Sequence, residues 1–203
     1  MIKNPEVFQG KNKLKNCKNY FEGWYFKHSE GDLGVSFIPA IHIHNGEKQA
    51  FIQVLTKTNS YYINYDFNEF KYSFSPFFIQ IGNNFFSKEK ISLDINDEKQ
   101  DLKISGELYY SRIQEIQKSL LSPNIMGPFS HIPFMECNHA ILSMKHNITG
   151  KIYVKHNSSV HIGDTTAEKY MNNSVLCFSN GIRIYRKRLG NFISKIIFMV
   201  PGK

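Results

Sequence analysis

Short runs of apolar residues, many alternating with polar ones, recur along the chain and are separated by clusters of Gly, Asn, Asp and Ser. Runs rich in aromatic and β-branched residues are typical of strands, because successive side chains of a strand point to opposite faces. The ranges with this pattern are Tyr20–His28, Leu33–His44, Lys48–Thr56, Tyr61–Phe67, Phe77–Ile81, Lys90–Ile95, Asp101–Tyr110, His139–Lys145 and Ile148–Val154.

The segments between these runs carry turn signals. Asn45-Gly46 is a dipeptide typical of a type I′ hairpin turn, and the other candidate turns are Ser29-Glu30-Gly31-Asp32, Gly82-Asn83-Asn84 and Asn96-Asp97. Only residues 111–121 have apolar positions at helical spacing, and Ser122-Pro123 ends that segment. The pattern predicts an all-β, antiparallel barrel or sandwich and does not choose between the two.

The composition sets the class of protein. A chain of 203 residues is long enough for one domain with a sizeable core, and its aromatic content of 14% suits an apolar pocket. Three cysteines without metal-site spacing, Cys17, Cys137 and Cys177, indicate reduced thiols in the cytoplasm. The polar start and the lack of a long apolar run predict neither a signal peptide nor a transmembrane helix. A hydrophobic ligand would therefore meet a cytoplasmic or peripherally membrane-bound protein.

The net charge of +8 raises the question of a nucleic-acid or anionic-membrane partner. Six of the 25 basic residues lie in the last 21 positions, which contain no acid. The rest of the chain has 19 basic and 17 acidic residues, so it is close to neutral. The lysines of residues 11–18 alternate with Asn and lack an aromatic neighbour, so we expect a solvated segment and no nucleic-acid partner.

One segment combines a constrained backbone with groups that can carry protons. It reads Met126-Gly127-Pro128-Phe129-Ser130-His131-Ile132-Pro133-Phe134-Met135-Glu136-Cys137-Asn138-His139. Gly permits a positive φ and Pro fixes φ, so this loop is held firmly before an apolar strand. A carboxyl group and an imidazole three residues apart among Phe, Ile and Met indicate a proton-handling site in an apolar pocket.

Together with Tyr20-Phe21-Glu22-Gly23-Trp24-Tyr25-Phe26-Lys27 and Phe8-Gln9-Gly10, this segment resembles the tocopherol cyclase family over the range from Phe8 to about Ile182. The resemblance implies a lipocalin-like β-barrel. It also implies an isomerase that protonates an isoprenoid double bond and lets a phenolic oxygen trap the cation, without a redox cofactor or metal. The expected ligand is a prenylated quinol or a similar isoprenoid, and alkene hydration on a carotenoid-like molecule begins in the same way.

The catalytic candidates follow from this chemistry, which needs a carboxylic acid that stays protonated near neutral pH. Glu136 is the first candidate for proton donor, with His139 orienting it or accepting the phenol proton, and Phe129 and Phe134 lining the pocket. The alternative is that Glu136 and His139 only satisfy each other and the loop backbone.

Glu22 is the rival proton donor. In a strand, Glu22, Trp24 and Phe26 share one face, while Phe21, Tyr25 and Lys27 share the other. An acid beside an indole suits a carbocation, which a π face stabilises, and Trp24 and Tyr25 are further ligand-binding candidates. The alternative is a core tryptophan with a Glu–Lys pair on the surface.

The other motifs give weaker indications of function. His42 and His44 share a strand face, but no third ligand is evident, so we expect no metal site. The chain has neither a GxSxG motif nor a phosphate-binding loop.

Residues 183–203 are abruptly basic and form a separate unit from the predicted domain at residues 1–182. Read one nucleotide out of frame, permitted codons for residues 184–195 can spell YIEKDWGTSFPK, which the family is expected to place after a turn like Phe178-Ser179-Asn180-Gly181. We therefore expect a frameshift near Ile182, a missing Asp-Trp-Gly motif and a barrel that is incomplete at its C-terminus. The alternative is a genuine basic end that contacts anionic lipid.

The leading hypothesis is a tocopherol cyclase-like isomerase. The alternatives are a non-catalytic barrel that binds a lipid or quinone, and an inert truncated remnant. A composition rich in Lys, Asn, Ile and Phe suggests AT-rich coding DNA and a bacterial source whose substrate differs from tocopherol precursors.

Overall fold

The computed structural model describes residues 8–30, 33–114, 138–143, 145–156 and 173–180. These residues form strands with three short helical segments near the start and after β4. The elements are η1 (Gly10–Asn12), α1 (Lys13–Asn16), β1 (Asn19–Glu30), β2 (Leu33–His44), β3 (Glu47–Thr56), β4 (Ser60–Tyr65), η2 (Phe67–Glu69), β5 (Phe70–Phe74), β6 (Phe77–Ile81), β7 (Asn84–Ser87), β8 (Lys90–Asp97), β9 (Leu102–Gln114), β10 (Asn138–Ser143), β11 (Lys145–His156) and β12 (Asn173–Asn180).

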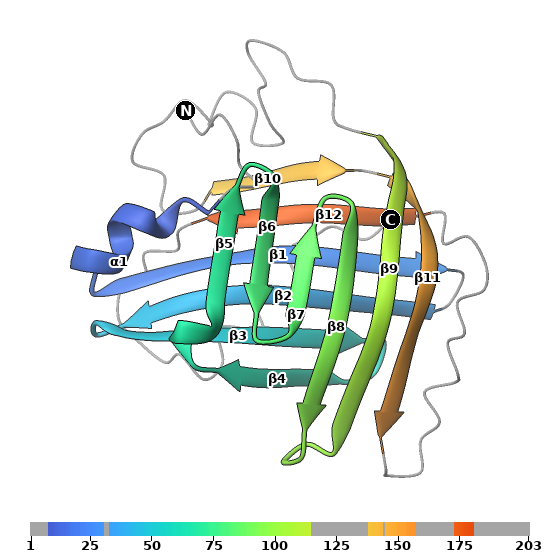
Figure 1. The fold of residues 1–203 in the computed structure, drawn as a ribbon, viewed down its shortest axis with the longest axis horizontal. Helices are drawn as coiled ribbons and strands as arrows, with labels where there is room; N and C mark the ends of the chain where they lie inside the picture. The colour runs from blue at the N-terminus through green and yellow to red at the C-terminus, as the bar shows by residue number, and fades with distance from the viewer. Residues whose placement is uncertain (1–7, 31–32, 115–137, 144, 157–172, 181–203) are drawn as a thin grey trace.

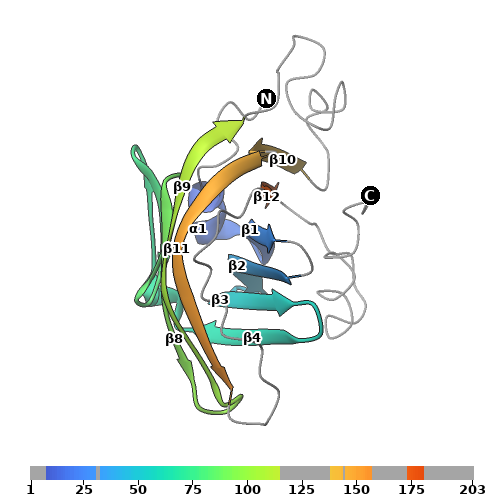
Figure 2. The ribbon, with the colours of Figure 1, turned by 90° about the vertical axis from the view of Figure 1, so that its right-hand side faces the viewer.

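The strands form two six-stranded antiparallel sheets. Sheet A has the order β10-β12-β1-β2-β3-β4, and sheet B has the order β11-β9-β8-β7-β6-β5. The strands of one sheet cross those of the other (Figure 1), and sheet B curves over one face of sheet A (Figure 2). No strand ladder joins the two sheets within the described residues, so this part of the chain is a crossed sandwich and not a closed barrel.

The core lies between the two sheets, and the alternation of the sequence explains it. In β1, Glu22, Trp24, Phe26 and His28 are all buried, while Lys27 is exposed and Tyr25 is half-buried. The expected division of this strand into two faces is therefore confirmed. Strands β6 and β8 show the same alternation, and their buried positions supply isoleucines and a leucine to the core.

The structure confirms every predicted strand, with its bounds shifted by a few residues at most in seven of the nine ranges and extended further in β9 and β11. It also confirms the hairpin turn at Asn45 and Gly46, whose φ angles of 52° and 90° are both positive, as a type I′ turn requires. The turn expected at Asn96-Asp97 begins two residues later, at Glu98, because β8 continues through Asp97.

Three expectations about secondary structure were wrong or incomplete. Ser111–Gln114 belongs to β9 and not to a helix, because Ser111 and Gln114 pair with Asn147 and Lys145 of β11; residues 115–121 lie outside the described residues. The turn expected at Phe178-Ser179-Asn180 is the end of β12, which pairs with both β1 and β10. Strands β5, β7 and β12 were not predicted.

None of the helices in the described part of the chain has the length and apolar character needed to cross a bilayer. The basic segment 183–203 lies outside the described residues, as does Ile182.

Candidate functional site

Two of the motifs that carry the resemblance meet at one end of sheet A. The backbone N–H groups of Gln9 and Gly10 donate hydrogen bonds to the carboxyl group of Glu22, across 13 and 12 positions of the sequence. The Phe8-Gln9-Gly10 motif is therefore hydrogen-bonded to Glu22, the acid of the Tyr20–Lys27 motif.

The third motif, which ends at Asn138 and His139, reaches the same sheet on β10. Asn138 pairs with Asn180 of β12, which in turn pairs with Glu22 of β1. Neighbouring strands are about 4.8 Å apart, so the backbones of Asn138 and Glu22 lie about 10 Å apart. In the same ladders His139 is level with Ser179 and Gly23.

Glu22 is enclosed by hydrogen-bond donors. Its side chain is 1% exposed. Oε1 accepts from Gln9 N at 2.8 Å, and Oε2 accepts from Gly10 N at 2.9 Å and from the Tyr20 hydroxyl at 2.6 Å. The expected surface Glu–Lys pair is therefore wrong, because Glu22 faces the interior and Lys27 is exposed.

Two opposing effects set the acidity of this carboxyl group. Burial raises the pKa of Glu22 to about 7, although the hydrogen bonds from Tyr20, Gln9 and Gly10 each lower it. Desolvation wins because it disfavours the charged form more than these donors stabilise it. Glu22 consequently holds a proton about half of the time near neutral pH, which is the condition that general acid catalysis favours.

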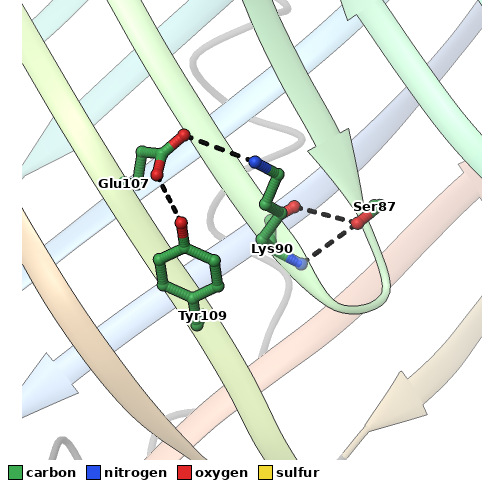
Figure 3. A network of polar contacts seen from close by, with 4 residues as sticks. All are labelled: Ser87, Lys90, Glu107 and Tyr109. Carbon is green, nitrogen blue, oxygen red and sulfur yellow. Dashed lines mark hydrogen bonds and ion pairs between the residues drawn. The ribbon is translucent and has the colours of Figure 1, made fainter.

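A similar pair on the surface shows that burial decides the direction. On β9, the Tyr109 hydroxyl donates to Glu107, and Lys90 Nζ lies 3.3 Å from Glu107 Oε1 (Figure 3). This network also includes Ser87, whose hydroxyl donates to the Lys90 carbonyl and accepts from its N–H. The pKa of Glu107 is lowered, first by the Tyr109 hydrogen bond, and the small desolvation of this exposed carboxyl group does not reverse that direction. The tyrosine hydrogen bond therefore lowers the carboxyl pKa in both pairs, and only the burial of Glu22 makes its net shift upward.

Aromatic side chains surround the position next to Glu22. Trp24, two residues along the same face, is fully buried. Its ring centroid lies 6.3 Å from that of Phe8 in a tilted arrangement and 6.3 Å from that of Phe70 in a stacked one. Phe8 also contacts Tyr72, with 4.6 Å between ring centroids. An acid beside several π faces is an environment that can donate a proton and stabilise a cation.

The remaining candidates from the sequence are placed as follows. Tyr25 lies on the other face of β1, where its hydroxyl accepts a hydrogen bond from Ser36 Oγ at 3.2 Å. Only the backbone of His139 is described. Glu136, Phe129 and Phe134 lie outside the described residues.

His42 and His44 share a face of β2, as expected, and Ile41 and Ile43 are buried on the other. The His42 ring lies against Phe51, with 5.8 Å between centroids, and burial lowers its pKa. Within the described ranges, no three His, Cys, Asp or Glu side chains come together in a way that could hold a metal ion.

The structure also contains a buried polar cluster that the sequence reasoning missed. His28 Nε2 and the Tyr110 hydroxyl share a hydrogen bond of 2.8 Å, and His146 Nδ1 lies 3.0 Å from Ser143 Oγ. The Tyr110 ring joins the two halves, because it stacks on His28 and meets His146 edge to face at 4.7 Å. We call these four residues the histidine cluster.

Burial determines the charge of this cluster. It lowers the pKa of His28 to about 3, aided by repulsion from His146, and that of His146 to about 4. Burial also raises the pKa of Tyr110 well above its usual range. All members are therefore neutral at physiological pH. One signal in the sequence could have pointed here: His28 continues the interior series Glu22, Trp24, Phe26.

Comparisons of the chain with family models, with curated proteins and with solved structures give no match.

Proposed function

We propose that the protein initiates chemistry on an isoprenoid alkene by protonation, as a tocopherol cyclase-like isomerase with a lipocalin-like architecture. Glu22 is the proton donor that the described residues offer. The observation that carries this proposal is a carboxyl group inside the sandwich, 1% exposed and next to Trp24, with a pKa of about 7.

The chemistry needs only a proton and a shielded cation. Protonated Glu22 transfers its proton to one carbon of the double bond, and the π electrons form the new C–H bond. The neighbouring carbon becomes a cation, which the faces of Trp24 and Phe70 stabilise. A phenolic oxygen of the same molecule attacks that carbon and releases its proton to the Glu22 carboxylate. The atoms balance as an isomerisation, and no electron carrier takes part.

The hydrogen bonds around Glu22 suit both states of this cycle. Gln9, Gly10 and Tyr20 all act as donors, so they hold the carboxylate that remains after proton transfer. The carboxyl proton of the acid form is then free to point at the substrate. In the same proposal Glu136 is the alternative donor and His139 an assisting base, while Phe129 and Phe134 contribute to ligand binding. Tyr25 is not part of this site, because it lies on the other face of β1.

The substrate class fits a cytoplasmic protein that contacts a membrane surface, since prenylated quinols reside in membranes. Such a ligand requires apolar walls, and the interior of this sandwich supplies many aromatic ones.

The decisive experiment is turnover of a prenylated hydroquinone in D2O. The cyclised product should gain one deuterium on carbon, which mass spectrometry detects as an increase of one mass unit. Glu22→Gln should reduce the rate by at least about 100-fold, the usual contribution of a general acid. Glu107→Gln is the matched control, because it changes an exposed acid that also accepts a tyrosine hydrogen bond, and it should leave the rate unchanged.

A non-catalytic hydrophobic-ligand barrel is the second candidate. The hydrogen bonds that Glu22 accepts from Gln9, Gly10 and Tyr20 favour it. The same bonds suit a structural carboxylate that holds the N-terminal segment in place. Binding of the hydroquinone without any deuterated product would establish this alternative. An inert remnant predicts neither binding nor a cooperative unfolding transition, so a sharp thermal transition would remove it.

A further inference from the structure

The histidine cluster bridges the two sheets, which makes it more than a local packing feature. His28 and Ser143 belong to β1 and β10 of sheet A, whereas Tyr110 and His146 belong to β9 and β11 of sheet B. All four are buried, with His28 at 1% and His146 at 2% exposure. A polar cluster at this position interrupts an interior that is otherwise largely aliphatic and aromatic.

The cluster has hydrogen-bonding capacity that the described residues do not use. His146 Nε2 is closed to solvent and meets no partner among the described residues. His28 Nδ1 is closed to solvent in the same way, although the nearby backbone of Val35 raises the pKa of His28. His146 Nε2 is therefore the clearer of the two unpartnered atoms. A buried polar atom without a partner costs roughly 1–3 kcal/mol. Native proteins rarely retain such atoms unless a ligand or a function uses them.

The group that would use these atoms is neutral. No lysine or arginine whose burial is described is buried, so a carboxylate or phosphate would find no cation in the interior. Each imidazole can present its free nitrogen as a donor or as an acceptor, according to its tautomer. A hydroxyl group, which both donates and accepts, complements such a nitrogen. Phe37, Tyr110 and His146 present ring surfaces around His28 and suit a flat apolar body.

We propose that the histidine cluster binds the hydroxyl group of a neutral phenol-type ligand, with His146 Nε2 as the principal contact. The site is independent of the acid at Glu22. His28 lies six positions after Glu22 on β1, which corresponds to about 20 Å along the strand. An oxygen held by the cluster is therefore too far away to trap a cation formed at Glu22, and it binds without taking part in the proposed ring closure.

A pair of probes of the same shape tests this site. p-Cresol and toluene differ by one hydroxyl group, so their difference isolates the polar contact. In the parent protein, p-cresol should bind about tenfold more tightly than toluene, the factor expected for one net hydrogen bond. Binding is measured by titration calorimetry. The 15N resonance of His146 Nε2 should shift with p-cresol and not with toluene.

His146→Phe keeps a ring of similar size and removes the free nitrogen, so the preference for p-cresol should disappear. His42→Phe, on the outer face of sheet A, is the matched control and should retain the preference. The NMR measurement needs no variant, so it decides the matter even if His146→Phe does not fold. Equal binding of the two probes, or a His146 resonance that p-cresol leaves unchanged at saturation, overturns the proposal. Neither result depends on whether Glu22 catalyses turnover.

Discussion

The backbone N–H of Gly10 donates a hydrogen bond of 2.9 Å to Glu22 Oε2, although the two residues lie 12 positions apart in different motifs. This contact depends on the absence of a side chain at Gly10. A Cβ atom there would lie 2.5 Å from the Phe8 ring and 2.6 Å from the Tyr20 ring. Both rings belong to the same site, since Tyr20 also donates to Glu22 and Phe8 contacts Trp24.

Gly10→Ala should therefore displace the N-terminal segment from Glu22. We expect the free energy of unfolding to fall by about 1–3 kcal/mol, the usual cost of inserting a group into a filled space. Urea denaturation measures the change. Gly34→Ala is the control, because the nearest atom to its Cβ lies 3.9 Å away. Equal stability of the two variants would show that the segment does not pack on Glu22 in solution.

The pKa of Glu22 predicts how stability depends on pH. It rises from 4.5 to about 7 on folding, so the folded state binds an extra proton between these two values. Glu22 alone therefore lowers the free energy of unfolding by about 3 kcal/mol as pH increases through this range. The histidine cluster acts in the opposite direction below pH 6.5, so the Glu22 contribution is the difference between the parent protein and Glu22→Gln, measured by urea denaturation from pH 4.5 to 8. This difference should fall with increasing pH, and a difference that stays constant would mean that Glu22 does not titrate in this range.

The histidine cluster predicts the opposite dependence. The pKa values of His28 and His146 fall from 6.5 to about 3 and about 4 on folding. The unfolded state then binds more protons below pH 6.5, so each histidine should reduce the free energy of unfolding by about 1.4 kcal/mol per pH unit as acid is added. His146→Phe should lessen this acid sensitivity, while His44→Phe, an exposed change, should not. If the free energy of unfolding of His146→Phe fell with acid as steeply as that of the parent protein, His146 would be solvated.

Two glycines in the β9–β11 ladder should be intolerant of substitution. Gly106 and Gly150 have φ angles of 135° and 132°, and a Cβ on either would lie 2.1 Å from a carbonyl oxygen of the facing strand. Gly106→Ala should cost roughly 2–4 kcal/mol, from backbone strain and steric overlap together. Thermal unfolding of Gly106→Ala and Gly150→Ala, beside Gly34→Ala, checks this. Similar melting temperatures for all three variants would show that the backbone of β9 and β11 shifts to accommodate the added Cβ atoms.

The sequence predicted most strands because their alternation is a local property. It failed at Ser111–Gln114, where pairing with β11 overrides helical spacing. It also missed β5 and β7, which are only five and four residues long. The spacing of Glu22 and Trp24 predicted that they share a face, but it left a surface Glu–Lys pair open as the alternative. Its hydrogen bonds to Gln9 and Gly10, and the meeting of His28 with Tyr110 and His146, depend on contacts distant in sequence that no local pattern encodes.

The order of strands in sheet A has a consequence for how the chain folds. β1 lies between β2, its neighbour in the sequence, and β12, which follows all six strands of sheet B. One side of β1 can pair as soon as β2 is made, but the other stays open until residues 173–180 are synthesised. Such long-range pairing slows folding and leaves a strand edge exposed meanwhile. If the Phe8-Gln9-Gly10 segment binds Glu22 early, it would cover the part of β1 around Glu22 until β12 is made.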